Sequence, residues 1–300
     1  MNTNILKKLI AALRFLFRRR LKITSNVINT PIKDFHYAID INNVINYGEA
    51  IENEKGQNLS KINKGKIHPL FYTKISWQII EKLNNYLEIP IDEKILKTIV
   101  HQSENINFYK ELLLPANLVV KPKLWSIGPH KKGSKLLIKF DYYSDNELVA
   151  TEYSSGLLFG VKCIGGGQSL GETPKTIKIN ETPIWQEQIE IEKTLPYIYA
   201  KKAEIDAPIH TNPKFAKSIG LPDIILQGTC TFAKSVSLIV AKELNNDSSK
   251  IKAVSAKFTG MVVPPNQITV RLLKNEKKLL YFDVLNNKGK AVLKGGQIML

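Results

Sequence analysis

Residues 199–233 read YAKKAEIDAPIHTNPKFAKSIGLPDIILQGTCTFA, and this stretch decides the fold of the chain. A short helix is predicted over 213–219, because Pro213 suits the first helical position and the Thr-Asn pair before it can cap free backbone N–H groups. Gly228 then precedes an apolar run whose large side chains recur at helical spacing. This run predicts a long helix over 229–243.

The segments around this stretch predict an antiparallel sheet beside the long helix. At the start of the stretch, residues 197–203 are compatible with either a strand or a short helix. After the helix, strand-forming residues gather in four short runs, at 252–258, 267–274, 278–285 and 291–298. The sequence Asn-Asn-Lys-Gly at 286–289 separates the last two runs and is typical of a hairpin turn.

The first half of the chain repeats this plan. A strand at 35–41 and a short helix at 42–50 precede a polar loop at 52–65, and a helical pattern around Trp77 ends before Pro90. Four strands are then predicted, at 97–101, 117–127, 135–143 and 147–163. A helix followed by an antiparallel meander, twice over, is an internal repeat and predicts two α+β domains.

A connection between the two domains is predicted around Gly165-Gly166-Gly167. A phosphate-binding loop is disfavoured there, because no Lys-Ser or Lys-Thr pair follows the glycines. Further Gly and Pro residues up to about residue 185 favour a linker instead. The predicted division is an amino-terminal segment 1–30, a first domain 31–165, a linker 166–190 and a second domain 191–300.

The 300-residue chain has a globular composition, with 43% hydrophobic and 23% charged residues, which excludes a disordered chain. Of the net charge of +16, residues 1–30 contribute seven bases and no acid, and the remaining 36 bases and 27 acids give +9. This excess indicates either a lysine-rich solvated surface or a partner that bears phosphates, namely nucleic acid, anionic lipid or coenzyme A. Nucleic acid is disfavoured, because the sequence contains no helix-turn-helix, zinc-finger or RNA-binding motif.

Residues 5–20 are predicted to form a basic amphipathic helix, with Leu6, Leu9 and Leu13 on its apolar side. The segment is too short and too charged to span a bilayer, and Arg14 interrupts the apolar core that a secretory signal needs. We favour a helix that lies on an anionic membrane surface. A helix docked on its own protein and a mitochondrial presequence stay open as alternatives.

Cys163 and Cys230 lie far apart and match no metal-binding spacing, so we interpret them as buried free thiols of a reducing compartment. The five histidines are scattered, and none belongs to a His-Glu-x-x-His pattern. We therefore predict no metal site, no cofactor, and a cytoplasmic protein that is peripheral at the membrane if residues 5–20 bind there.

Residues 199–233 closely resemble the motif region of the MaoC-like dehydratases, a family that includes the (R)-specific enoyl-CoA hydratases (hydratase 2). The family pattern runs from a Tyr through Ser-Gly-Asp-x-Asn-Pro-[Ile/Leu]-His and Gly-[Phe/Leu]-x-x-Pro-Ile to His-Gly. The matching positions are Tyr199, Pro208, Ile209, His210, Ala216, Gly220, Leu221, Ile225 and Gly228. The first half resembles the family's degenerate amino-terminal domain more weakly, through His101-Gln102-Ser103 and the later run Leu-Leu-Pro-Ala-Asn, so the resemblance covers residues 32–300.

The resemblance implies a tandem (double) hot-dog fold of the α+β class, in which each long helix is wrapped by a curled antiparallel sheet. In the family, an Asp and a His activate a water that adds across the double bond of a 2-enoyl thioester, or that leaves in the reverse dehydration. Backbone N–H groups at the start of the hot-dog helix polarise the thioester oxygen. Gly228, followed by Thr229, takes that place in this chain.

The sequence departs from the family pattern at three positions, because Ile205 stands at the Asp position, Ala207 at the Asn position and Gln227 at the His before Gly. Asp206 lies one residue late, where an extended loop points its side chain to the opposite face unless a bulge turns it back. Gln227 can still donate a hydrogen bond to a carbonyl. His210 is expected to face the substrate, with the alternative that it caps the following helix or satisfies buried carbonyls.

The first hypothesis is a MaoC-like hydratase or dehydratase that acts on an acyl-CoA or acyl-carrier-protein thioester, with the acyl tail in the first domain. The second is a non-catalytic acyl-thioester or lipid-binding module that residues 5–20 hold at a membrane. A thioesterase ranks lowest, because the second domain lacks a carboxylate-bearing helix start. The residues assigned to the first hypothesis are His210 and Asp206 for acid/base chemistry and Gln227, Gly228 and Thr229 for substrate binding.

Overall fold

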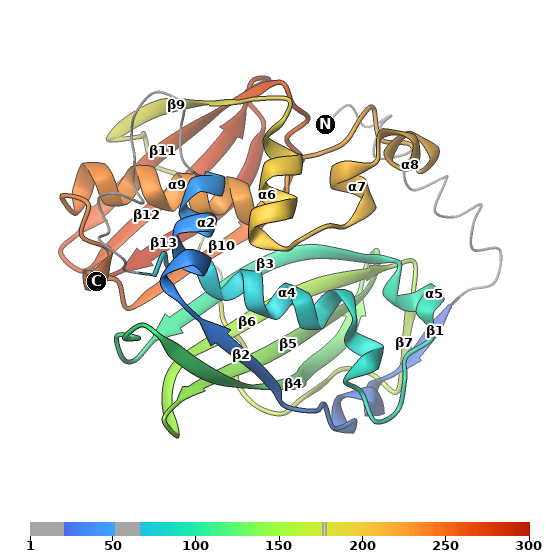
Figure 1. Ribbon diagram of the computed structural model, residues 1–300. Coiled ribbons are helices and arrows are strands. Elements are labelled where there is room, and N and C mark those ends of the chain that lie inside the picture. The colour runs from blue at the N-terminus through green and yellow to red at the C-terminus, as the bar shows by residue number, and fades with distance from the viewer. Residues whose placement is uncertain (1–20, 52–66, 176, 178) are drawn as a thin grey trace.

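The computed structural model describes residues 21–51, 67–175, 177 and 179–300, and it shows a mixed α+β molecule built around one long sheet (Figure 1). The helices are α2 (Ile41–Ile51), α4 (Phe71–Glu81), α5 (Glu93–Leu96), α6 (Leu195–Ala203), α7 (Pro208–Thr211), α8 (Pro213–Ser218) and α9 (Gly228–Glu243). Short 3-10 turns are η1 (Ser25–Asn29), η2 (Leu83–Asn85) and η3 (Ser248–Lys250).

The strands of the first half are β1 (Lys22–Thr24), β2 (Phe35–Ile39), β3 (Ile99–Phe108), β4 (Ala116–His130), β5 (Gly133–Ser144), β6 (Glu147–Phe159), β7 (Lys162–Ile164) and β8 (Gln168–Ser169). Those of the second half are β9 (Trp185–Ile191), β10 (Ala253–Phe258), β11 (Asn266–Glu276), β12 (Leu279–Asn286) and β13 (Ala291–Met299). The 11-stranded sheet runs in the order β2-β4-β5-β6-β3-β10-β13-β12-β11-β9, with β8 beside β4.

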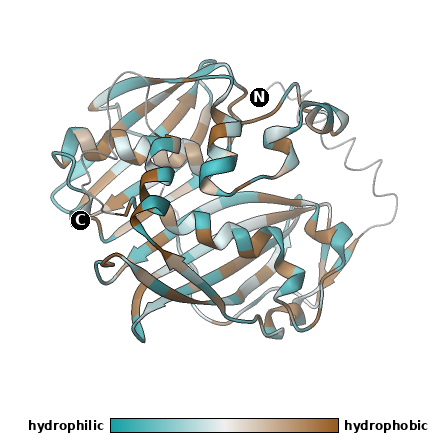
Figure 2. Cartoon of the chain, in the orientation of Figure 1, coloured by the Kyte–Doolittle hydropathy of each residue, from teal (hydrophilic) through white to brown (hydrophobic). Residues whose placement is uncertain are grey.

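The two halves of this sheet join where β3 pairs antiparallel with β10, with Ile106 opposite Val254 and Ser103 opposite Lys257. Helix α4 lies against the strands of the first half, and α9 lies against those of the second (Figure 1). Hydrophobic and hydrophilic residues alternate along the strands (Figure 2), as expected for a sheet with one face covered by helices. Each half is therefore a long helix packed on an antiparallel meander.

Helix α2 belongs to the first half by sequence but packs on α6 and α9 of the second. The hydroxyl of Tyr47 lies 3.4 Å from that of Tyr199 and donates to the carbonyl of Leu70 at 3.0 Å. The ammonium of Lys234, in α9, donates to the carbonyl of Ile51 at 2.9 Å, which satisfies a charge that the helix buries. These contacts fix the two halves relative to each other.

Most predicted elements are present, and the long helix begins one residue before its predicted start. Residues 197–203, compatible with either structure, are helical within α6, and the first-half helix begins at Phe71, ahead of the pattern around Trp77. Strand β9 begins inside the segment 166–190 that was predicted as a linker and ends at Ile191, the first residue of the predicted second domain. Only Ile189 and Ile191 of this edge strand are buried, so its sequence looked like a polar connection.

Both cysteines are free and buried, as predicted. The helix predicted over 5–20 and the loop predicted over 52–65 lie outside the described residues. Within the ranges that the structure describes, no helix combines the length and apolar character needed to cross a bilayer.

Candidate active site

His210 is held in place at the third residue of α7, on the loop that leads from α6 to α8. Its side chain is buried, and its Nδ1 lies 2.7 Å from the carbonyl oxygen of Ile225. Because a carbonyl can only accept, Nδ1 carries the proton in this contact and Nε2 keeps the free lone pair. The backbone N–H of Ile225 in turn donates to the carbonyl of Ile209 at 3.2 Å.

The imidazole of His210 is neutral over the physiological range. Burial lowers the pKa of His210 from 6.5 to about 4, against the opposing effects of the Ile225 carbonyl and the charge of Asp206. A neutral imidazole with a fixed tautomer can accept a proton at Nε2. His210 therefore has the electronic state of a general base.

Asp206 is exposed and does not pair directly with that base. Its carboxylate accepts a hydrogen bond from the hydroxyl of Thr211 at 2.7 Å, and within the described ranges no hydrogen bond joins it to His210. Its negative charge still raises the pKa of His210, so the two residues interact through space. The loop thus brings Asp206 close enough for its charge to act on the imidazole, but its carboxylate is hydrogen-bonded to Thr211 and not to His210.

Ile205 and Gln227 tie the His210 loop to the start of α9. The Ile205 side chain is 2% exposed and belongs to the main core, so an apolar anchor occupies the position where the family has its Asp. The amide nitrogen of Gln227 donates to the carbonyls of Ile205 at 3.3 Å and Pro196 at 3.1 Å. Both amide hydrogens are thereby engaged within the protein, and the buried Oε1 of Gln227 has no partner in the described part of the chain.

Gly228 begins α9 directly after this tie. The N–H of Thr231 makes a hydrogen bond to the Gln227 carbonyl at 3.2 Å, so the N–H groups of the first helical residues have no partner inside the helix. A Cβ atom at Gly228 would come within 2.9 Å of the Phe258 ring, so close packing requires a glycine here. The Thr229 side chain is buried, which leaves its backbone N–H as the group available to a ligand.

The first half contributes aromatic residues to the same region. The Phe258 ring, which packs on Gly228, lies 4.3 Å from the His101 ring, and His101 lies 5.3 Å from the ring of Trp77 in α4. The indole N–H of Trp77 is buried without a hydrogen-bond partner among the described residues. His101 carried the weaker part of the sequence resemblance, whereas no sequence pattern marked Trp77 or Phe258.

Glu81 is a second carboxylate that the sequence reasoning missed. It ends α4, and although its side chain keeps contact with solvent, partial burial and the charge of Asp206 raise the pKa of Glu81 to about 7. The helix of the first half therefore ends beside the loop that holds His210. No sequence signal identifies this residue, because the contact arises only when the two halves pack together.

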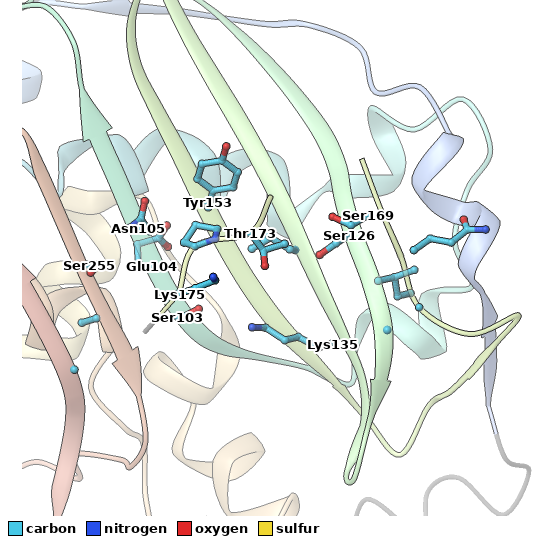
Figure 3. A pocket seen from close by; sticks show the side chains of 18 of the residues that line it. Ser103, Glu104, Asn105, Ser126, Lys135, Tyr153, Ser169, Thr173, Lys175 and Ser255 are labelled. Carbon is cyan, nitrogen blue, oxygen red and sulfur yellow. The ribbon is translucent and has the colours of Figure 1, made fainter. Parts of the chain in front are cut away.

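The cavity shown in Figure 3 does not contain any of the five predicted site residues. It lies at the first-half strands, on the side of Ser103 and Tyr153, and is considered separately below. The described residues include no group of three or more His, Cys, Asp or Glu side chains that could hold a metal ion.

Comparison with known families identifies the second half. A family model described as a MaoC like domain matches residues 176–293, so this part of the chain is a MaoC-like domain and the resemblance of 199–233 is confirmed. The chain is 22% identical over 215 residues to peroxisomal multifunctional enzyme type 2 of Drosophila melanogaster, a match that covers 71% of this chain and 36% of that protein. It is 25% identical over 227 residues to the peroxisomal enoyl-CoA hydratase 2 of Arabidopsis thaliana, which covers 71% of this chain and 72% of that protein.

Comparison with solved structures agrees on the fold. The crystal structure of a MaoC-like dehydratase from Phytophthora capsici superposes with a TM-score of 0.79 at 17% sequence identity, over 91% of this chain and 97% of that chain. The α+β architecture with a large antiparallel sheet is therefore the fold of the MaoC-like dehydratases.

Proposed function

We propose that this protein is a hydratase or dehydratase that acts on the double bond of 2-enoyl (3-hydroxyacyl) thioesters in fatty acid metabolism, with His210 as its acid/base. The observation that carries the proposal is the tie between the His210 loop and the start of α9. Three hydrogen bonds make that tie: His210 to Ile225, Ile225 to Ile209, and Gln227 to Ile205. They support the proposal, because they connect the loop that carries a neutral imidazole to the segment that leads into the start of α9.

The proposed reaction uses two groups, the imidazole of His210 and the N–H groups at the start of α9. Nε2 of His210 takes a proton from water while the water oxygen bonds to C3 of the enoyl group. The electrons of the double bond move toward the thioester oxygen, and the N–H groups of Gly228 and Thr229 stabilise the charge that develops there. C2 then takes a proton from the imidazolium, so that one water has been added and His210 is neutral again.

Asp206 supports this cycle as a displaced partner. Its charge stabilises the imidazolium that forms during the reaction, in line with its effect on the pKa of His210. Gln227 acts as a positioning residue, because its amide nitrogen holds the backbone of Ile205 and Pro196 and has no hydrogen left for the substrate.

The double hot-dog form belongs to the same proposal. Each half is a long helix on an antiparallel meander, and the superposition on the Phytophthora protein extends over 91% of the chain. We therefore assign residues 31–165 to a first hot-dog domain and 191–300 to the second, joined by 166–190. The first domain would receive the acyl tail beside Trp77 and His101. The carrier of the thioester is coenzyme A or an acyl carrier protein.

The test is hydration of a short and a long trans-2-enoyl-CoA, followed by loss of the enoyl absorbance. We expect the parent to turn over at least one of them and His210→Ala to lose at least 100-fold in kcat, since positioned acid/base catalysis contributes about 10²–10⁴. His36→Ala, which changes an exposed histidine on β2, is the matched control and should keep parental activity.

A parent protein that binds enoyl-CoA saturably but turns over neither substrate would contradict the proposal. Equal activity of the parent and His210→Ala would contradict the assignment of the base while leaving the reaction itself in place. Circular dichroism of each variant shows whether a loss reflects unfolding.

A further inference from the structure

A cavity of about 380 Å³ lies between the first-half sheet and the segment that leads to the second half (Figure 3). Its floor is formed by β3, β4, β5 and β6, with β10 and β13 of the second half at its edge, and residues 167–169 and 173–175 form its roof. The roof is fixed in place, because the N–H of Leu170 donates to the carbonyl of Trp125 and the Trp125 indole donates to the carbonyl of Glu172, both at 2.9 Å. The cavity is therefore built into the fold by ordered contacts.

The cavity lies on the sheet face opposite α4. Along β3, Ser103 and Asn105 line it in alternation with the buried side chains of Glu104 and Ile106, and Glu104 also contributes to the lining. The Glu104 carboxylate contacts the His101 imidazole at 3.0 Å. Burial raises the pKa of Glu104 well above its ordinary value, which favours the uncharged carboxyl group beside the cavity.

The lining is rich in hydrogen-bonding groups. Hydroxyls come from four different strands and from the roof, and the hydroxyl of Ser103 lies 2.5 Å from that of the buried Ser155 in β6. These groups are contributed by Ser103, Ser126, Tyr153, Ser169, Thr173 and Ser255. Such a lining favours a polar ligand over an acyl chain.

Lysines converge on this lining. Lys135 enters from β5 and Lys175 from the roof, and Lys257 stands opposite Ser103 in the β3–β10 pairing. Burial and then the charge of Lys257 lower the pKa of Lys135, so Lys257 acts on Lys135 as a neighbouring positive charge. In the part of the chain that the structure describes, none of the three lysines forms an ion pair.

We infer that this cavity binds a small molecule that bears phosphate groups. Lys135 and Lys257 repel each other unless an anion lies between them, Lys175 adds a further cation to the lining, and lysine is a common phosphate ligand. Hydroxyl donors on the floor suit the remaining phosphate oxygens. The volume falls within the range of roughly 300–1,000 Å³ that is typical of small-molecule sites. This inference does not rest on the hydratase proposal, because the cavity and His210 share no residue.

Isothermal titration calorimetry of the full chain with pyrophosphate tests the inference. We expect one saturable site whose affinity falls as salt is added, and at least tenfold weaker binding by the double variant Lys135→Gln/Lys257→Gln. The matched control is Lys277→Gln/Lys278→Gln, which removes the same charge from an exposed hairpin and should bind as the parent does.

Thermal melting separates a lost ligand site from a lost fold. Because Lys135 and Lys257 repel each other, the double variant should melt at or above the temperature of the parent when pyrophosphate is absent. Inorganic phosphate and adenosine 3′,5′-bisphosphate, the nucleotide end of coenzyme A, form two further arms. Tighter binding of the bisphosphate identifies the carrier nucleotide as the ligand, and tighter binding of the inorganic anions identifies free phosphate.

The inference is overturned if the parent shows no saturable binding of any of the three probes. Equal weakening in the control variant would also overturn it, because binding would then follow overall charge and not this cavity.

Discussion

The two halves share an architecture but fill the space between helix and sheet in opposite ways. In the second half, Phe232 of α9 stacks on Phe282 of the sheet with ring centroids 6.1 Å apart, and both side chains are fully buried. In the first half, Ser76 of α4 donates to the buried carboxyl group of Glu152 at 2.5 Å. The fold therefore tolerates an acidic interior in one half and an apolar interior in the other.

The acidic interior holds two carboxyl groups, Glu104 and Glu152, which are 1% and 0% exposed. Burial raises the pKa of each well above its ordinary value, and the proximity of Glu104 raises that of Glu152 further. Tyr142 donates to Glu152 at 2.5 Å, whereas the nearest base, His101, is neutral because burial lowers its pKa to about 4. With no cation beside them, the two carboxyl groups keep at least one proton at neutral pH.

Phe232→Ala should give the largest change in stability. The substitution leaves an apolar cavity beneath α9, and we expect a loss of about 3–5 kcal/mol in the free energy of unfolding. Because the ring contacts of Phe232 are with the uncharged side chains of Phe258 and Phe282, the loss should be the same at pH 5 and pH 8. Urea unfolding at the two pH values measures it, and a strongly pH-dependent loss would show that the second half is not the apolar partner in this comparison.

Gly228→Ala should cost less, about 1–3 kcal/mol, because the new Cβ would lie 2.9 Å from the Phe258 ring and the core would be overpacked. It should also lower the rate of hydration, since the strain acts at the start of α9. Phe258→Leu in the same chain makes room for the methyl group and should restore part of both losses. If the double variant is as impaired as Gly228→Ala alone, contact with Phe258 is not the reason for the glycine.

Glu104→Gln should change the pH dependence of stability. A carboxyl group with a raised pKa in the folded state contributes stability at low pH, and this contribution is lost as the pH rises from the ordinary value of 4.5 toward the raised one. The parent should therefore lose stability between pH 5 and pH 8, and the variant should lose less. Glu88→Gln, which changes an exposed carboxylate, is the control. Parallel pH curves for the parent and Glu104→Gln would mean that the acidic pair does not titrate within the fold.

The sequence predicted the apolar half of this comparison better than the acidic half. Helix α9 and the four strands after it followed from periodicity to within a few residues, because their buried side chains are apolar. Glu104 and Glu152 lie 48 positions apart in sequence, and isolated acids in strands usually face solvent. Only the pairing of β3 with β6, which places Ile106 opposite Glu152 and Glu104 opposite Ser154, brings them together.

Some residues of the candidate site were predictable from the sequence and others were not. The spacing within 199–233 identified His210 and Gly228, whose positions depend on local structure. It also placed an apolar residue at the position of the family's Asp, and the structure gives Ile205 a role as a core anchor. Glu81, Trp77 and Phe258 reach the site from other segments, and one sequence without its folded contacts holds no information on such an approach.

Asp206→Asn should have the smallest effect, and it decides how the site works with an apolar residue at the Asp position. Because Asp206 is exposed and accepts a hydrogen bond from Thr211, its charge is only weakly coupled to the site. We therefore expect Asp206→Asn to decrease kcat by roughly threefold at pH 7. Its charge raises the pKa of His210, so its removal should lower that pKa and move the acid limb of the kcat/KM profile, expected near pH 4 in the parent, to lower pH. A pH profile of both proteins measures the shift, and Thr211→Val, which removes only the hydroxyl, is the control. A 100-fold loss in Asp206→Asn would mean that its carboxylate transfers a proton directly, in which case the loop rearranges on substrate binding and Thr211 releases the side chain.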